Sequence, residues 1–438
     1  MNKPFSSDEI DTMRSYFMKN INIEGKGGTV AAPDQDTPGG SYYYHWMRDG
    51  ALTMRSLQET AANLTEYDSQ LQAYSQWVLH VQSLSDPNGI DIRTEPKFEL
   101  PNGEVFTGGW CRPQNDGPGL RAYSLMLYAQ ALIAAGRADY VTQYLWTGSG
   151  DKNGGAIKYD LDYVIDGWGS STCDLWEEYT NADLFWNRIT MKKAMLAGAV
   201  FAENMGDAAS AAAYSSTAAA IDETLYASHW TGTFVEEATG RTMDGAVIIG
   251  FNEGFDESDK LFAPTCYEVA STVREYNQLF CSEYAVNRQD SEDGLPGVLY
   301  GRYENDGYAG GNPWQLITAA LGNLFYRCSA NPTSIRSMPH MSVGALGGLS
   351  DEALAEQFAI AGESLSPPRS CVILICVSAG DSVLQRLRHH VEGDGFHLFE
   401  QIDENNGSQM SAEDLTWSYA EVLNAMHSRD IYRQNTKA

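Results

Sequence analysis

The residues of this sequence best suited to chemistry are two adjacent carboxylates behind a tryptophan, in residues 174–178 (Asp-Leu-Trp-Glu-Glu). An aromatic neighbour can partly desolvate one acid and keep it protonated near neutral pH, while the other acid stays ionised and binds polar groups. Such a pair suits a general acid beside a ligand for hydroxyl groups. The alternative is a solvated Glu-Glu pair at a helix start, which the pentapeptide taken alone favours.

The charge and composition of the chain narrow the range of partners. A net charge of -29 argues against nucleic acid or an anionic membrane surface, because either would be repelled. The chain holds 10 Trp and 24 Tyr, several of them beside charged residues or glycine. Flat rings next to carboxylates suit sugar recognition, although core packing explains most of them. A neutral substrate therefore fits best. The longest apolar run, residues 371–377, is too short to span a bilayer.

No metal or organic cofactor is predicted. The seven cysteines include no CxxC pair and no histidine partner at ligand spacing, and their odd number leaves at least one thiol unpaired within the chain. The sequence contains no dinucleotide fingerprint, phosphate loop, nucleophile elbow or HExxH motif. Residues 86–89 faintly suggest a calcium loop, but the spacing is wrong for one and predicts a turn.

The cellular compartment stays open on the residues alone. Residues 1–9 lack an apolar stretch of signal-peptide length, so the protein is either intracellular or has lost a signal. Asn63 and Asn406 each begin an N-glycosylation tripeptide, which is weak evidence for secretion because such tripeptides often arise by chance.

The elements that must position these residues are predicted to be helices, because strand-like alternation is sparse. Long loops rich in glycine, proline, aromatic and charged residues lie between the helices at 25–40, 86–121 and 301–314, and such loops usually carry function. The main segments with apolar residues at helical spacing are 7–18, 51–57, 67–84, 120–135, 138–145, 157–163, 185–204, 208–227, 266–280, 314–325, 381–391 and 411–427.

Residues 329–380 do not resemble their surroundings. Proline, serine and methionine are frequent there, the helical pattern at 351–361 is only moderate, and an isolated apolar tract follows at 371–377. The segment receives no physical role from its sequence and is interpreted as an insertion or a fault in the gene sequence. Regular patterning resumes at 381–391, followed by an ordered segment at 396–403.

Five motifs, at residues 42–49, 110–118, 174–178, 302–314 and 400–419, together resemble the catalytic domain of the glucoamylases, glycoside hydrolase family 15. The resemblance runs in the family's order over nearly the whole chain and fails clearly only around 329–380. It implies an all-α fold, an (α/α)6 barrel of six outer and six inner helices that forms one catalytic domain over residues 1–438. No starch-binding domain follows, so activity on raw granules should be poor.

The implied reaction is inverting hydrolysis of terminal α-1,4-linked glucose, and more slowly α-1,6-linked glucose, from the non-reducing ends of starch-type glucans. The product is β-D-glucose, the partner is an α-glucan or malto-oligosaccharide, and a monomer that is secreted is expected from the resemblance. Two alternatives remain, namely the same barrel acting on another α-glucoside such as trehalose or dextran, and a non-catalytic glucan-binding or regulatory module.

Inversion needs an acid and a base whose carboxyl groups lie roughly 6.5 to 9.5 Å apart. By its match to the family's Trp-Glu-Glu motif, Glu177 resembles the acid, and Glu178 resembles a ligand for sugar hydroxyls. Glu400 falls in the family's Glu-Gln-x-Asp segment and resembles the base, ahead of three nearby rivals, Glu404, Glu413 and Glu421. Ser411 matches a family serine that hydrogen-bonds the base. Retention of both carboxylates argues against the binding-module alternative.

The other predicted substrate-binding residues are carried over one at a time from the resemblance. Arg48 and Asp49 resemble the pair that binds the terminal glucose, and Arg302 resembles the second arginine of the pocket. Cys111 stands where glycine is usual, so the loop of Trp110 is expected to be stiffer. For each tryptophan, plain core packing remains an alternative. The predicted aromatic residues of the pocket are Tyr42, Trp46, Trp110, Trp176, Trp314 and Trp417.

Overall fold

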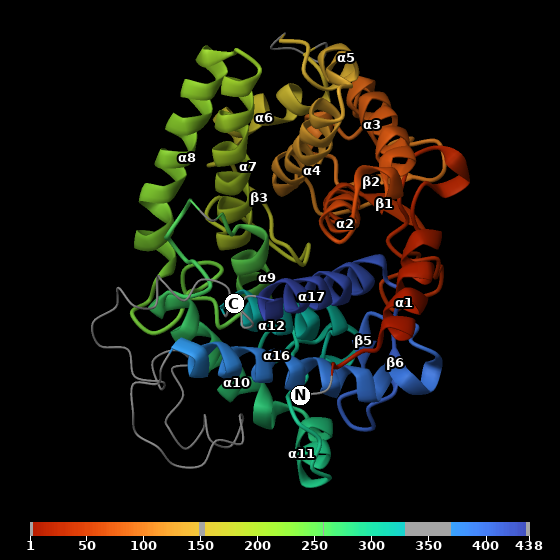
Figure 1. The fold of residues 1–438 in the computed structure, drawn as a ribbon, viewed down its shortest axis with the longest axis vertical. Helices are drawn as coiled ribbons and strands as arrows, with labels where there is room; N and C mark the ends of the chain where they lie inside the picture. The colour runs from red at the N-terminus through yellow and green to blue at the C-terminus, as the bar shows by residue number, and fades with distance from the viewer. Residues whose placement is uncertain (1–2, 149–153, 257, 329–368, 435–438) are drawn as a thin grey trace. The chain divides into compact units, whose positions relative to one another are not determined.

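The structure, a computed structural model, describes residues 3–148, 154–256, 258–328 and 369–434 (Figure 1). The chain divides into two compact units, one formed by Met1–Tyr16 with His229–Ala438 and the other by Phe17–Ser228. Helices make up most of both units, and the strands are short antiparallel pairs. Among the described residues, no helix combines the length and the apolar character needed to cross a bilayer.

In the unit Phe17–Ser228, the helix α4 is central. It packs against α2, α6 and α7, and its apolar residues are buried on nearly all sides, as expected of an interior helix. A buried ion pair between Arg121 and Asp160, at 2.7 Å, joins α4 to α6. The elements of this unit are η1 (Ile23–Gly25), β1 (Tyr44–Trp46), α2 (Met47–Glu59), η2 (Leu64–Glu66), α3 (Asp68–Ser83), η3 (Ile92–Thr94), β2 (Lys97–Glu99), α4 (Asp116–Ala134), α5 (Ala138–Tyr140), η4 (Val141–Leu145), α6 (Ala156–Gly167), β3 (Thr172–Cys173), β4 (Thr180–Asn181), α7 (Phe185–Asn204) and α8 (Ala208–His229).

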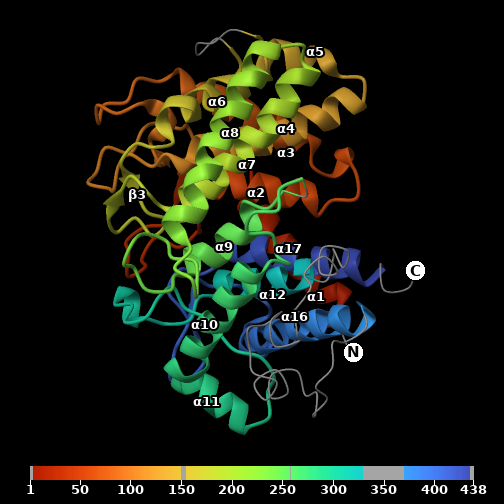
Figure 2. The ribbon, with the colours of Figure 1, turned by 90° about the vertical axis from the view of Figure 1, so that its left-hand side faces the viewer.

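The helices α7 and α8 form a long antiparallel pair, which is visible in two views (Figures 1 and 2). A side-chain hydrogen bond from Arg188 Nη1 to Thr224 Oγ1, at 2.7 Å, crosses between them. Lys192 on α7 also pairs with Asp222 on α8. These polar links join the two helices.

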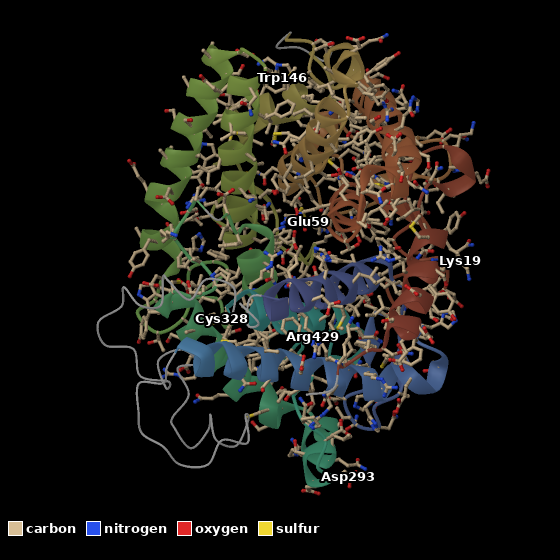
Figure 3. The ribbon with its side chains drawn as sticks, viewed as in Figure 1. Lys19, Glu59, Trp146, Asp293, Cys328 and Arg429 are labelled. Carbon is tan, nitrogen blue, oxygen red and sulfur yellow. A yellow bond between two sulfur atoms is a disulfide. The ribbon has the colours of Figure 1, made fainter. Side chains whose placement is uncertain are left out.

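In the other unit, α12 is central and packs against α9, α16 and α17. The buried Asp381 on α16 accepts hydrogen bonds from Arg429 on α17, at 2.5 and 2.8 Å, and from Tyr326 on α12, at 2.8 Å; Arg429 is labelled in Figure 3. One carboxylate therefore ties three helices together. The elements are α1 (Ser7–Lys19, which ends in the other unit), α9 (Gly245–Glu253), α10 (Tyr267–Glu283), α11 (Ala285–Glu292), η5 (Tyr308–Gly310), α12 (Gln315–Cys328), α16 (Arg369–Val391), η6 (Glu392–Asp394), β5 (Gln401–Ile402), β6 (Gln409–Met410) and α17 (Thr416–Gln434).

The helical segments predicted from apolar spacing are present, and several of their boundaries differ from the prediction. The helix α4 begins at Asp116, four residues before the predicted start, because Pro118 is tolerated in a first helical turn. The last helix begins at Thr416 and not at 411, since Ser411 and Asp414 have positive φ angles of 66° and 55°. The helix predicted over 381–391 begins earlier, at Arg369, within the segment 329–380 that was interpreted as an insertion or a fault in the gene sequence. Residues 329–368 lie outside the described residues, so this interpretation stays a prediction.

Two helices, α9 and α11, were not predicted from the sequence, for opposite reasons. The helix α9 is buried along its whole length, so its apolar run shows no amphipathic period. The helix α11 is mostly polar and short. The predicted turn at residues 86–89 is present, with the N–H of Gly89 bonded to the carbonyl of Asp86 at 3.2 Å.

Candidate active site

Glu177 lies in a short hairpin loop whose backbone is held by hydrogen bonds to the side chain of Asp174. The strands β3 and β4 pair with each other, and residues 174–179 connect them. Asp174 is buried and accepts backbone N–H groups from Trp176 at 3.3 Å, Glu178 at 2.7 Å and Tyr179 at 3.1 Å. Glu177 itself has a φ of 64°, which costs roughly 1 kcal/mol or more for a residue with a Cβ. The bonds to Asp174 hold the loop in this strained conformation.

The Glu177 carboxylate accepts four hydrogen bonds. Its Oε1 accepts from Trp46 Nε1 at 3.1 Å, from Arg48 Nη2 at 3.1 Å and from Gln114 Nε2 at 2.8 Å. Among the described residues, its Oε2 accepts from Trp110 Nε1 alone, at 2.8 Å. Because Oε1 is saturated by three donors, Oε2 is the oxygen with room to carry and deliver a proton.

The junction of β1 and α2 positions three of the predicted residues. Trp46 ends β1, and Arg48 and Asp49 lie in the first turn of α2, which begins at Met47 and not at the predicted residue 51. The turn is tight, because a Cβ at Gly50 would stand 2.3 Å from Cε1 of the buried His45 ring. Only glycine fits that close approach, and it fixes the direction in which α2 leaves the strand.

Arg48 is largely occupied by groups of the protein itself. Its Nη1 donates to Gln114 Oε1 at 2.9 Å and to Asp116 Oδ2 at 3.0 Å, and its Nη2 donates to Glu177. Burial opposes its charge, but Asp116, Glu177 and Asp49 together raise the pKa of Arg48. The resemblance implies that Arg48 binds the terminal glucose, whereas the structure shows Arg48 bridging Gln114, Asp116 and Glu177, which orients the Glu177 carboxylate. Gln114 and Asp116 lie in the motif at 110–118, but the sequence does not indicate their role in holding Arg48.

Asp49 is the better candidate for a direct sugar ligand. Its carboxylate is partly exposed, and its closest guanidinium atom is Arg48 Nε at 4.0 Å. No side chain of the described residues hydrogen-bonds it. Loss of solvation, with help from the nearby Glu177 and Asp116, raises the pKa of Asp49 to about 6 even though Arg48 opposes this. Its oxygens are therefore available to sugar hydroxyls.

Replacing Asp49 with asparagine should stabilise the fold while weakening substrate binding. The native state holds a proton on Asp49 up to about pH 6 and the unfolded state only up to 3.8, so the unfolding free energy falls as pH rises through that window. Asp49→Asn removes this penalty, and we expect roughly 2 kcal/mol of extra stability near pH 7 and almost none near pH 4, from denaturant unfolding at both values. We expect kcat/KM on maltose to fall roughly 10-fold to 100-fold. Unchanged glucose release would exclude Asp49 from sugar binding.

A disulfide fastens the loop of Trp110 to the hairpin of Glu177. Cys111 and Cys173 are bonded, with their Cα atoms 6.0 Å apart. Cys111 follows Trp110, and Cys173 precedes Asp174, so each half of the bridge adjoins a residue that contacts or supports Glu177. Arg112 fixes the same loop by donating to the carbonyls of Gly108 at 2.9 Å and Phe106 at 2.7 Å. The stiffness expected from Cys111 thus takes the form of a covalent cross-link, which a count of cysteines could not assign to a pair.

Breaking this disulfide should cost both stability and turnover. For Cys111→Ser we expect a loss of roughly 2 to 4 kcal/mol in unfolding free energy, since the bridge closes a long loop. Turnover on maltose should fall several-fold because Trp110 is no longer held against Glu177. Cys281→Ser, at an exposed cysteine, is the matched control and should change neither quantity. Lost stability with normal kcat would mean that the bridge stabilises the fold without positioning Trp110.

In the other unit, the hairpin of β5 and β6 brings Glu400 beside Ser411. The strands pair Gln401 with Met410, and the backbone N–H of Glu400 bonds to the carbonyl of Ala412 at 2.9 Å. The Ser411 hydroxyl donates to Glu400 Oε2, and Gln401 Nε2 donates to the same oxygen at 3.1 Å. Glu400 is 1% exposed. The hydrogen bond expected for Ser411 is therefore present, and Gln401 is a second donor that the sequence analysis did not name.

Arg302, Trp314 and Trp417 lie in the same unit as Glu400 but in different settings. Arg302 forms a two-pronged ion pair with Asp306, at 2.7 and 2.6 Å, and its guanidinium faces the Trp314 ring at 5.3 Å. Trp314 is bridged to Gln401, which places it beside Glu400. Trp417 is buried and donates to Glu421 at 3.0 Å, one turn along α17. The indole N–H of Trp417 and one carboxylate oxygen of Glu421, a rival candidate for the base, are therefore bonded to each other.

The remaining predicted residues belong to the hairpin of Glu177 and the wall near it. Tyr42 is half-buried, with its ring centroid 5.8 Å from that of Trp46. The ring centroids of Trp46 and Trp110 are 5.7 Å apart. Trp176 is half-buried and Glu178 is exposed, so both side chains of the hairpin are at least partly accessible to solvent. The structure therefore groups most of the predicted sugar ligands around Glu177.

The helix-rich structure is similar to solved glucoamylases, and its fold is that of a glycoside hydrolase with an (α/α)6 barrel. The family model described as Glycosyl hydrolases family 15 matches residues 13–427, and the chain belongs to this family. Both the predicted fold class and the family resemblance are thereby confirmed.

Individual relatives agree with this assignment. The glucoamylase of Blastobotrys adeninivorans is 30% identical over 467 residues, which cover 98% of this chain and 72% of that protein. The solved family 15 glucoamylase from Hypocrea jecorina has a TM-score of 0.81 at 27% identity, covering 97% of this chain and 72% of that one. The glucoamylase from Saccharomycopsis fibuligera has a TM-score of 0.80 at 26% identity, covering 97% and 95%.

Proposed function

We propose that Glu177 and Glu400 are the acid and the base with which this chain hydrolyses glucans. The chain is an exo-acting glycoside hydrolase that releases glucose from starch-type glucans, in keeping with its family and with its similarity to glucoamylases. The observation that supports the role of Glu177 best is the division of its four donors, three on Oε1 and one on Oε2.

In the proposed mechanism, Glu177 Oε2 delivers its proton to the glycosidic oxygen as the bond breaks, which leaves the carboxylate to its four donors. Glu400 takes a proton from the water that attacks the opposite face of the sugar. Hydrogen bonds from Ser411 and Gln401 to Glu400 favour its ionised form, which a base requires. The product is β-D-glucose, because the water arrives opposite the leaving group.

The substrate contacts of the proposal follow the same geometry. Asp49 binds hydroxyls of the terminal glucose, Tyr42 and Trp46 line it, and Trp110 stands between the acid and the next sugar. The exposed Glu178 is suited to hydroxyls beyond the cleaved bond. All of these groups suit a neutral substrate, which also fits the net charge of -29.

The proposal also covers the setting in which the enzyme works. A disulfide next to the proposed acid supports an oxidising compartment, and therefore export from the cell. We further propose that residues 1–438 act as one catalytic domain in a monomer.

Glucose release from maltoheptaose, with the anomer followed by proton NMR, tests the proposal. We expect β-glucose from the first minutes, no internal fragments, slower release from isomaltose, and little release from trehalose or dextran. Initial α-glucose would contradict inversion, and early short oligosaccharides would contradict exo action. If trehalose or dextran were cleaved faster than maltoheptaose, the proposed substrate would be wrong and the enzyme would act on another α-glucoside.

A further inference from the structure

Two buried cysteines face each other between the helices α12 and α16. Cys328, which is labelled in Figure 3, ends α12, and Cys376 lies in α16; they are 7% and 6% exposed. Their Sγ atoms are 3.1 Å apart and are not bonded to each other. This separation is only about 1 Å longer than a disulfide bond. We call these two residues the Cys328–Cys376 pair.

The helices α12 and α16 approach each other closely next to this pair. A Cβ at Gly322 of α12 would stand 3.2 Å from the side chain of Leu384, and a Cβ at Gly380 of α16 would stand 2.5 Å from the ring of Tyr326. The contacts run in opposite order along the two helices, which are therefore antiparallel, and the Cys328–Cys376 pair is the next contact in this series. Two glycines allow the backbones to come close, so main-chain packing brings the two thiols together.

Two thiols in contact can be half of a metal site, packed apolar side chains or the reduced form of a disulfide. A structural metal such as Zn²⁺ takes four ligands. Within the described part of the chain, no third Cys, His, Asp or Glu lies near enough to form a group of three with the pair. Buried cysteines also serve as small apolar side chains, but that role requires no contact between sulfur atoms. The contact therefore favours a disulfide.

We propose that Cys328 and Cys376 form a second disulfide, which joins α12 to α16. The inference rests on the oxidising compartment proposed above, in which Cys111 and Cys173 are already bonded. The oxidant is a small-molecule disulfide such as oxidised glutathione. One cysteine thiolate attacks this disulfide and releases one thiol, and the other cysteine thiolate then attacks the mixed disulfide and releases the second thiol. Two protons and two electrons thus pass from the cysteines to the oxidant.

The bond is expected to form while the chain folds. The hydrogen bond with Cys328 and burial together raise the pKa of Cys376. The thiolate that the exchange requires is therefore scarce once the helices are packed. In the unfolded chain the same thiol is exposed to solvent, and a larger fraction of it is ionised. Reduced protein that has already folded should consequently oxidise much more slowly than a refolding chain.

The Cys328–Cys376 pair lies at the far end of a helix whose start contacts the hairpin of the proposed base. Gln315, the first residue of α12, donates its backbone N–H to the carbonyl of Glu400 at 3.1 Å and its side-chain amide to Gln409 Oε1 at 2.7 Å. The helix has 14 residues, so its two ends are about 20 Å apart. The disulfide should therefore stabilise α12 and α16 without changing the geometry of Glu400.

Peptide mapping of the full chain, both secreted and refolded with reduced and oxidised glutathione, tests the inference. Free thiols are blocked with N-ethylmaleimide, and the protein is digested with trypsin without a reductant. We expect residues 328–336 to be linked to residues 370–386, together with the link between Cys111 and Cys173. Because residues 370–386 also contain Cys371, Cys371→Ser should keep the new link and Cys376→Ser should lose it.

The link between Cys111 and Cys173 separates failure of this inference from failure of the proposed compartment. If that link were present in the secreted chain while Cys328 and Cys376 were both blocked as free thiols, the second disulfide alone would be excluded. The pair would then be packed apolar side chains. If neither link were present in the secreted chain, the oxidising compartment would be wrong, and this inference with it. Glucose release from maltoheptaose tests the proposed hydrolysis independently of both results.

Thermal unfolding measures what the disulfide contributes. For oxidised protein, Cys376→Ala should melt roughly 2 to 4 °C below the parent, the shift expected when a cross-link is lost from a chain of this length. For protein refolded in reductant, the two should melt together, and kcat on maltose at 25 °C should be the same in both. Cys266→Ala is the matched control, because Cys266 is also 7% exposed, and its melting difference from the parent should not depend on the reductant. An equal deficit of Cys376→Ala under both conditions would mean that only packing was lost and would overturn the proposal.

Discussion

Replacing Glu177 with glutamine should lower kcat on maltose by roughly 10² to 10⁴-fold, the range expected when a general acid is lost. The amide keeps the shape of the side chain but cannot deliver a proton from the position of Oε2. KM should change little, because Trp46, Trp110 and Arg48 remain in place around it. Initial-rate kinetics on maltose and maltoheptaose measure the effect.

A substrate that needs no protonation provides the control. Fluoride leaves without acid assistance, so Glu177→Gln should hydrolyse α-glucosyl fluoride at a rate much closer to that of the parent than it does maltose. Glu178→Gln should raise KM more than it lowers kcat, since the exposed Glu178 is a proposed hydroxyl ligand. Near-normal turnover of maltose by Glu177→Gln would exclude Glu177 as the acid.

Replacing Glu400 with glutamine should lower kcat by a similar factor, roughly 10² to 10⁴-fold, but with a different substrate dependence. The missing function is activation of water, so α-glucosyl fluoride should be hydrolysed as poorly as maltose. The hydrogen bonds from Ser411 and Gln401 can still be made to an amide oxygen, which keeps the hairpin in place. Parallel kinetics of the two glutamine variants on the two substrates therefore separate acid from base.

An added small anion checks the assignment of Glu400. Azide needs no base to attack, so it should restore turnover in a variant with a smaller side chain, Glu400→Ala, and yield the β-glucosyl azide. Glu413→Gln is the matched control, because Glu413 is exposed and close in sequence, and it should behave as the parent. If Glu413→Gln were the slow variant and Glu400→Gln the normal one, the base would lie elsewhere in this segment.

Most of the helices could be predicted because the spacing of apolar residues indicates an amphipathic helix. The pattern fails where a helix is buried on all sides, as in α9, or where dihedral angles and not hydrophobicity set the boundary, as at Ser411. At the start of α4 the predicted boundary was too late. Pro118 was taken as part of a loop, although a proline is tolerated in the first turn of a helix and lies there in α4.

The candidate site could be predicted in its residue types but not in its internal connections. The Trp-Glu-Glu motif identified Glu177, whereas its saturation by three donors on one oxygen depends on side chains from two other segments, the β1–α2 junction and the loop of Gln114. Asp174 and Gln114 both lie in motifs that the sequence analysis recognised. Their hydrogen bonds, however, follow only from the three-dimensional structure. The pairing of Cys111 with Cys173 was likewise out of reach, because seven cysteines allow many pairings.

The bonds inside the Glu177 hairpin have a consequence for how this enzyme could be re-engineered. Three backbone N–H groups converge on Asp174, so inserting or deleting one residue in this loop would move the acid, and loop grafts must carry the aspartate with them. Side-chain changes at positions 176 and 178 leave those backbone bonds intact. Libraries randomised at these two positions should therefore vary substrate preference while the acid keeps its place.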